Sequence, residues 1–222
     1  MKAGFFRRLS SSIVDMTIVL GIIYLSFILF GRTIIQNQID NYDEMNAAYT
    51  EIMSIYSQDS RQIDDDYFEA IELAGEDETL KAEAAEERYV QKEILLRQNE
   101  IDIAPYTSAI NSYYANSTYY FLLIFLVLML IYSFATKGLT LGRRLMKIRL
   151  AGELTPMKLF LHDIAFKYLL IVLFAVINPL FGIMIIMFMF LIDTALIAAT
   201  RNKNTIRDMI SKITVEKTEL NY

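Results

Sequence analysis

The sequence has no cysteine and a single histidine, His162, among its 222 residues. Without cysteine the chain can form neither disulfides nor thiolate metal sites, and nucleophilic catalysis by a Cys–His pair is excluded. A Ser–His–Asp arrangement would have to be assembled from residues whose positions do not suggest one. We therefore predict that the protein is not an enzyme and that it uses no cofactor.

Charged residues are scarce in three long stretches, and much of the chain's 55% hydrophobic content collects there. The stretches cover residues 13–35, 119–135 and 164–199. A helix needs about 20 apolar residues to cross the hydrocarbon core of a bilayer. The third stretch is too long for one crossing, and Asn178-Pro179 divides it because proline has no backbone donor. We predict an all-α membrane protein with four transmembrane helices, at 12–35, 117–136, 159–177 and 180–199.

Lysine and arginine collect in three segments between or beyond these spans. The segments are the amino end with Lys2, Arg7 and Arg8, the loop 137–158, and the tail 201–222 with Arg201, Lys203, Arg207, Lys212 and Lys217. With four spans all three segments fall on one side of the membrane. Basic loops favour the cytoplasmic side, so we predict that both termini are cytoplasmic.

The segment 36–116 then lies outside the cytoplasm, and it carries 19 acidic residues against five basic ones. Apolar and aromatic residues recur every three or four positions from Ile35 to Tyr56, which predicts that the first span continues outward as a helical stalk. A second helix is expected over 78–100, and a third from Pro105 into the second span. The insert is interpreted either as a helical hairpin or bundle with a solvated acidic face, or as a surface for cations, cationic peptides or a basic partner protein.

Three charged residues stand inside the predicted spans: Asp15, Lys167 and Asp193. Measured from the basic end of each span they lie at a similar depth, so we predict that they form one polar cluster. The cluster has two interpretations: a structural network that neutralises its own charges, or carboxylates that exchange protons or bind a cation along a pathway. Whether Arg8 reaches Asp15 stays open, because seven residues separate them by about two turns. His162, near an interface, is expected to be solvated.

Two short motifs resemble ligand sites but lack the required residues. Asp64-Asp65-Asp66 has neither the spacing nor the distal Glu of an EF-hand loop, so no metal site is predicted. The segment 138–144 has too few residues between its glycines for a phosphate loop and no Lys followed by Ser or Thr. Its basic residues are expected to meet anionic lipid headgroups. The candidate residues of this loop are Gly138, Thr140, Gly142, Arg143 and Arg144.

Three segments in the same order resemble the RDD family of small bacterial membrane proteins, which is named for one Arg and two Asp. "AGFFRRLSSSIVD" is similar to the family's opening pattern, "GLTLGRRLMKIRL" to its Gly-x-Thr-Leu-Gly-Lys/Arg-Arg segment, and "TIRDMISKITV" to its closing Leu-His-Asp pattern. The resemblance implies that Arg8, Asp15 and Asp208 are the family residues. Two departures stand out: Arg207 replaces the usual His, and His162-Asp163 stands where an Arg-acid pair is common.

The resemblance covers about 1–35 and 117–215 and implies a multi-pass protein of the bacterial cell membrane. It leaves the insert 36–116 outside the family core. Some members look like ion antiporters and others like regulators of membrane proteins, so two functions are predicted. The first is transport, cation or proton coupled, by an oligomer of this chain. The alternative is a non-catalytic accessory or inhibitory protein that binds a membrane or extracytoplasmic protein partner through the insert. The lipid bilayer is the expected environment, and no nucleic-acid partner is predicted.

Overall fold

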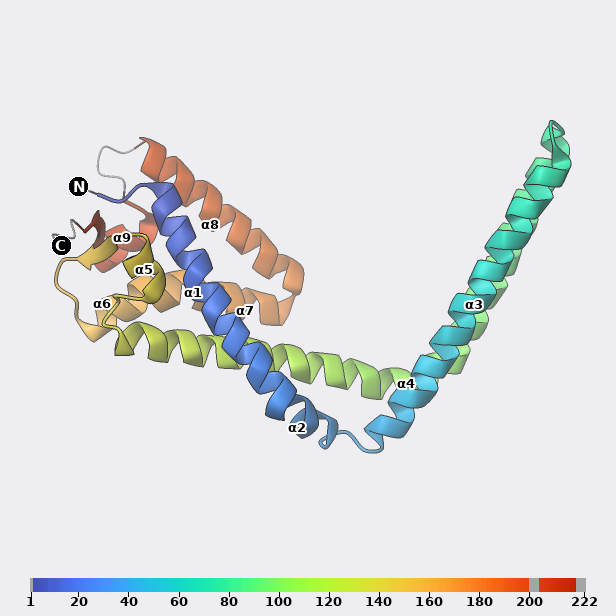
Figure 1. The fold of residues 1–222 in the computed structure, drawn as a ribbon, viewed down its shortest axis with the longest axis horizontal. Helices are drawn as coiled ribbons and strands as arrows, with labels where there is room; N and C mark the ends of the chain where they lie inside the picture. The colour runs from blue at the N-terminus through green and yellow to red at the C-terminus, as the bar shows by residue number, and fades with distance from the viewer. Residues whose placement is uncertain (1, 200–203, 219–222) are drawn as a thin grey trace. The chain divides into compact units, whose positions relative to one another are not determined.

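The computed structural model describes residues 2–199 and 204–218, and it divides into two compact units. The first unit comprises Met1–Gly31 with Thr118–Tyr222, and the second comprises Arg32–Ser117. Figure 1 shows the path of the chain, and each unit is described by itself below. Arg201 and Lys203, which contribute to the predicted basic tail, lie outside the described residues.

Four helices among the described residues are long and apolar enough to cross a membrane, as the sequence predicts. The first is continuous from Phe5 to Gln36 and consists of α1 (Phe5–Ser26), the π-helix η1 (Phe27–Gly31) and α2 (Arg32–Gln36). The second is part of α4 (Glu78–Ala135). The third consists of α6 (Pro156–Phe160), the π-helix η2 (Leu161–Leu169) and α7 (Leu170–Ile177). The fourth is α8 (Pro179–Ala199).

The boundary between the third and fourth helices falls at Asn178, as the sequence predicts. Asn178 has extended dihedrals, since the residue before a proline avoids the helical region. Its side-chain oxygen accepts a hydrogen bond of 2.9 Å from the backbone N–H of Leu180. A Cβ built on Gly182 would lie 2.7 Å from the Cβ of Ala175, so α7 and α8 approach closely because residue 182 is glycine.

One end of the first unit is closed by a small cap made from three distant parts of the chain. Strand β1 (Ile148–Ala151) pairs antiparallel with β2 (Thr214–Lys217), with Ile148 opposite Lys217 and Ala151 opposite Thr214. The amino end joins this ribbon, because the N–H of Ala3 donates to the carbonyl of Val215 at 2.9 Å. The short helices α5 (Leu141–Leu145) and α9 (Ile206–Ser211) complete the cap. Over the residues that the structure describes, the fold is therefore all-α except for this two-stranded ribbon, which we did not predict from the sequence.

The cap has its own apolar core, separate from the core among the helices. Its fully or nearly fully buried members are Ala3, Ile148, Leu150, Leu159, Ile213 and Val215. Burying such side chains stabilises a fold by about 1.5 to 3 kcal/mol each relative to exposure. The cap therefore fixes the amino end, the loop after α4 and the segment after α8 against one another.

The second unit contains a helical hairpin, and two sequence predictions about it need correction. The stalk does not continue from the first span, because the chain leaves α2 after Gln36 and restarts as α3 (Tyr42–Ala74) beyond Asn41, which has the left-handed φ of 52° that asparagine tolerates. A new helix does not begin at Pro105, which lies inside the continuous α4. A proline removes one backbone hydrogen bond, and the long helical segments on both sides maintain the helix across that gap.

Candidate functional site

A chain of five buried charged residues joins the cap to the third membrane helix. Arg143 of α5 pairs with Asp163 of η2 through both terminal guanidinium nitrogens: Nη1 lies 2.8 Å from Oδ2, and Nη2 contacts Oδ1. His162 lies between two carboxylates, with Nδ1 2.7 Å from Asp163 and Nε2 2.9 Å from Asp208 of α9. Arg8 of α1 completes the chain, because its Nη1 lies 2.5 Å from Asp208 Oδ2. Four separate elements are thus linked by ion pairs.

A capping box at the start of α9 positions Asp208 between His162 and Arg8. Thr205 and Asp208 form this box: the N–H of Thr205 donates to Asp208 at 3.0 Å, and the N–H of Asp208 donates to the Thr205 hydroxyl at 3.3 Å. Burial would raise the pKa of Asp208, but the hydrogen bond from His162 and the charge of Arg8 hold this pKa well below its usual range. Asp208 is therefore an anion that binds two cations.

The two carboxylates around His162 determine its protonation state. A neutral imidazole has one N–H and one lone pair, so one of its nitrogens would face a carboxylate without a proton between them. An imidazolium donates from both nitrogens and satisfies both Asp163 and Asp208. Three cations and two anions then alternate along the chain. Breaking a buried ion pair by removing one partner costs about 3 to 5 kcal/mol, so this network holds the cap to the helices.

Asp15 lies in a second, separate set of hydrogen bonds. Its carboxylate accepts from the hydroxyl of Tyr132 at 3.0 Å, the hydroxyl of Thr140 at 2.6 Å and the backbone N–H of Gly142 at 2.8 Å. A Cβ on Gly142 would overlap the carbonyl oxygen of Ser11 and lie 2.9 Å from Asp15 Cγ, so only glycine allows α5 to approach α1 this closely. Asp15 thus docks the start of α5 onto the first membrane helix.

The third set of charges surrounds a cavity of about 160 Å³ between α1, η2, α8 and the segment that starts α9. We call it the basic cavity, and it is lined by Phe5, Arg8, Leu9, Ser12, Lys167, Phe190, Asp193, Ile197, Thr205 and Arg207. Lys167 lies 4.7 Å above the ring of Tyr168 and makes no ion pair with a described residue. Asp193 Oδ1 and Arg207 Nε are buried atoms that have no hydrogen-bond partner among the described residues.

These positions correct several predictions. The predicted cluster divides, because Lys167 and Asp193 line the basic cavity whereas the hydrogen bonds of Asp15 come from α4, α5 and the turn between them. For Arg8, whose reach toward Asp15 the sequence left open, the structure shows an ion pair with Asp208. His162 is 1% exposed, so the expectation that it is solvated is wrong.

The loop residues are also placed differently from the prediction that they meet lipid headgroups. Arg143 is buried, and its Nη1 also donates to the carbonyl of Gly138 at 2.5 Å. Attraction to Asp163 holds the pKa of Arg143 above its usual value in spite of burial. Thr140 and Gly142 face Asp15, and Arg144 alone of the two arginines is exposed. The loop is therefore largely a structural connector.

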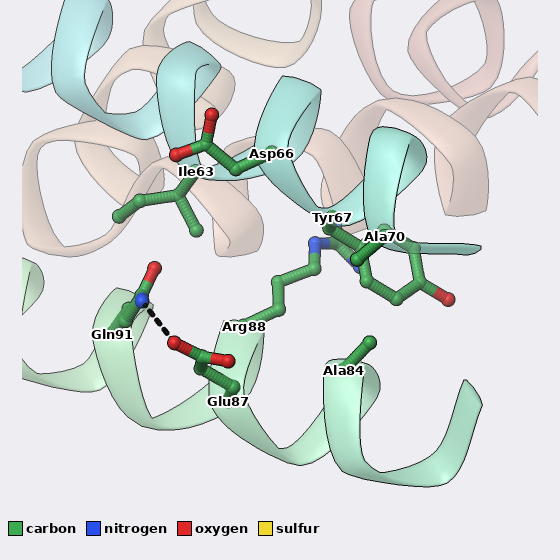
Figure 2. A pocket seen from close by; sticks show the side chains of 8 residues that line it. All are labelled: Ile63, Asp66, Tyr67, Ala70, Ala84, Glu87, Arg88 and Gln91. Atoms are coloured by element: carbon green, nitrogen blue, oxygen red, sulfur yellow. Dashed lines mark hydrogen bonds between the residues drawn. The ribbon is translucent and has the colours of Figure 1, made fainter. Parts of the chain in front are cut away.

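The hairpin carries a niche of about 130 Å³ between α3 and α4, shown in Figure 2. The guanidinium of Arg88 lies 4.9 Å from the ring centre of Tyr67, and Gln91 donates to Glu87 at 3.0 Å. Beside the niche, Asp64 accepts hydrogen bonds from Lys92 and Arg88, and these bonds lower the pKa of its carboxyl group. The niche is solvent-exposed and already contains its own charge pairs, so it is a contact between the two helices of the hairpin.

Comparison with known families now places the chain. A model of the RDD family matches residues 89–212. The chain belongs to the RDD family. Among proteins of curated function and among solved structures, the comparisons found no match.

The RDD match sets limits on the residue assignments. It includes Asp208 and the loop with Arg143, and it begins within α4 at residue 89, inside the insert that the sequence analysis placed outside the family core. It does not include 1–88, so the assignment of Arg8 and Asp15 as family residues stays a prediction. In the structure Arg8 and Asp208 form one ion pair, while Asp15 belongs to the neighbouring set of bonds.

Proposed function

We propose that this RDD protein is a transporter of the bacterial cell membrane, coupled to protons or a cation and working as an oligomer. The proposal rests on one contrast among the charges of the membrane helices. Asp15 and Asp163 have each of their oxygens hydrogen-bonded, whereas Asp193, beside a cavity, keeps a buried oxygen without a partner among the described residues. An intramembrane carboxylate of this kind is costly and is characteristic of proton and ion pathways.

In this proposal Asp193 is the coupling group and no catalytic step is assigned. A carboxylate with an open lone pair next to a cavity that also contains charged side chains can accept a proton or a small cation and release it again. Lys167, which makes no ion pair with a described residue, provides a positive charge in the wall of the same cavity. Four helices offer little material to enclose a pathway, which favours an oligomer.

The proposed orientation places the cap in the cytoplasm. The amino end, the loop after α4 and the segment of α9 and β2 meet in the cap, and they carry the basic residues that favour the cytoplasmic side. Both termini would then be cytoplasmic and the acidic hairpin extracytoplasmic.

The first test is coupled flux in reconstituted vesicles. Purified wild-type protein in liposomes with an internal pH dye should move protons when a sodium or potassium gradient is imposed. Vesicles without protein, and vesicles with heat-inactivated protein, are the controls. Absence of flux under every imposed gradient would remove the transport proposal.

A second candidate is an accessory role through the hairpin. The hairpin combines its acidic excess with exposed apolar side chains, among them Phe68 and Leu73 at 62% and 81% exposure, which a partner surface could cover. The double variant Asp65→Asn/Glu69→Gln should weaken crosslinking to a membrane partner. Neutralising two acids at the cap, Glu153→Gln/Glu216→Gln, is the matched control, and equal crosslinking in both variants would count against this role.

A further inference from the structure

The basic cavity carries more positive than negative charge that is not already paired. Arg8 is committed to Asp208, and Asp208 also binds His162. Of the remaining charged side chains that line the cavity, Lys167 and Arg207 are cations without an ion pair to a described residue, and Asp193 is an acid. Two unpaired cations facing one carboxylate leave a surplus of positive charge, which an anion would neutralise.

The unpartnered atoms define what such an anion must offer. Among the described residues, the Nε of Arg207 is a buried donor without an acceptor, and the Lys167 ammonium makes no hydrogen bond. Asp193 Oδ1 is a buried acceptor to which no described residue donates. Buried polar atoms in native proteins are nearly always hydrogen-bonded, so the cavity is incomplete as it stands. A ligand with several acceptor oxygens and one neighbouring donor would satisfy all three groups.

We propose that the basic cavity binds the phosphate of a phospholipid headgroup that carries a hydroxyl or ammonium donor. The phosphate oxygens accept from Lys167 and Arg207, and the headgroup donor meets Asp193. The rest of the wall is largely apolar, with Leu9 and Phe190, and exposed apolar faces of α1 and α8 continue beyond it to receive acyl chains.

Position and size agree with this ligand. The cavity adjoins the cap at the basic end of the spans, where headgroups lie, and basic pockets between membrane helices are known to bind anionic headgroups. Its volume of about 160 Å³ is some ten times the roughly 10 to 15 Å³ that one ordered water requires. Lys167 is brought there by η2, and π-helical segments in proteins often mark functional sites. The headgroup donor and a transported proton or cation would use the same oxygen of Asp193, so the two would bind there in turn. Lipid retention can be measured whether or not the protein transports ions.

The test measures lipid retention by native mass spectrometry. Wild-type protein in detergent is titrated with phosphatidylglycerol, with phosphatidylethanolamine, and with diacylglycerol, which lacks phosphate. Wild type should retain one phospholipid and no diacylglycerol. Lys167→Met and Arg207→Gln should each weaken retention by about tenfold or more, because each removes a charged hydrogen bond. Lys158→Met is the matched control, since it removes a lysine from the same span that pairs with Glu153 away from the cavity.

Thermal unfolding and competition with inorganic phosphate distinguish a lipid headgroup from a free anion in the cavity. Lys167→Met should unfold at or above the wild-type temperature, because it removes a charge that has no ion pair, and Lys167→Arg should restore phospholipid binding. In the same samples, inorganic phosphate at millimolar concentration should not displace the lipid. If inorganic phosphate stabilises wild type but not Lys167→Met, and no lipid is retained, the ligand is a free anion and the headgroup proposal is overturned. Equal retention of phospholipid by wild type and Lys167→Met would also overturn it.

Discussion

Replacing Asp208 by Asn tests whether the charged chain holds the cap to the helices. The side chain is fully buried and accepts from Arg8 at 2.5 Å, His162 at 2.9 Å and the N–H of Thr205 at 3.0 Å. Asparagine keeps the shape and one acceptor oxygen but removes the negative charge between two cations. The loss of one partner from a buried ion pair costs about 3 to 5 kcal/mol. We therefore expect Asp208→Asn to lower the free energy of unfolding by about that amount.

The assay is unfolding in mixed detergent and SDS micelles, followed by circular dichroism at pH 7. Asp65→Asn makes the same chemical change on an exposed turn of α3 and should unfold like wild type. The double variant Arg8→Met/Asp208→Asn should recover part of the loss, because it no longer leaves the charge of Arg8 buried without its carboxylate. If Asp208→Asn unfolds together with Asp65→Asn, the ion pairs do not stabilise the cap.

Three other predictions follow from the same geometry. Because the pKa of Asp208 is lower in the folded protein, its carboxylate contributes fully to stability above its unfolded pKa of about 4, and this contribution is lost as the pH falls toward the folded pKa. In SDS titrations, the stability difference between wild type and Asp208→Asn should therefore be constant above about pH 5 and shrink below about pH 4. A difference independent of pH would contradict this. Gly142→Ala should lower the free energy of unfolding by about 1 to 3 kcal/mol, because its Cβ would force α5 away from α1. Gly21→Ala is the control and should not destabilise the protein, since the space around its Cβ is open. Equal effects of the two variants on thermal unfolding would contradict the close packing of α5 on α1. Asp64→Asn removes partly exposed ion pairs of the hairpin and should leave the unfolding temperature almost unchanged at high salt. A large drop in the unfolding temperature at high salt would contradict the weak contribution expected of such pairs.

The membrane helices could be predicted because their signal is local. A run of about 20 apolar residues has one stable state in a bilayer, and Asn178-Pro179 could divide the longest run for a stereochemical reason visible in two residues. Pro105 shows the limit of such rules. A proline favours the first turn of a helix but does not end a helix that is long on both sides, and α4 continues through it.

The charged chain could not be predicted because it joins residues from four distant segments. Depth along each span was the available argument for grouping Asp15, Lys167 and Asp193, and depth says nothing about the direction in which a side chain points. The π-helix η2 adds a second obstacle. In an α-helix, residues 162 and 167 lie about 140° apart around the axis, whereas the i to i+5 bonds of a π-helix bring such residues closer to one side. The sequence gives no sign of this change.

A sequence signal for His162 did exist in its neighbour. An adjacent His-Asp pair at the foot of a membrane helix places two titratable groups where lipid begins, and burial there requires partners of opposite charge. The partners, Arg143 and Asp208, were each singled out for other reasons. Only the folded cap shows that they meet.

We propose that Asp193 serves transport while the paired carboxylates hold the structure. This division of roles is tested by proton flux driven by a sodium or potassium gradient, in vesicles with matched amounts of wild type and Asp193→Asn. We expect flux in wild type, and flux reduced to the level of empty vesicles in an Asp193→Asn variant that unfolds at no lower temperature. Undiminished flux in folded Asp193→Asn would contradict it.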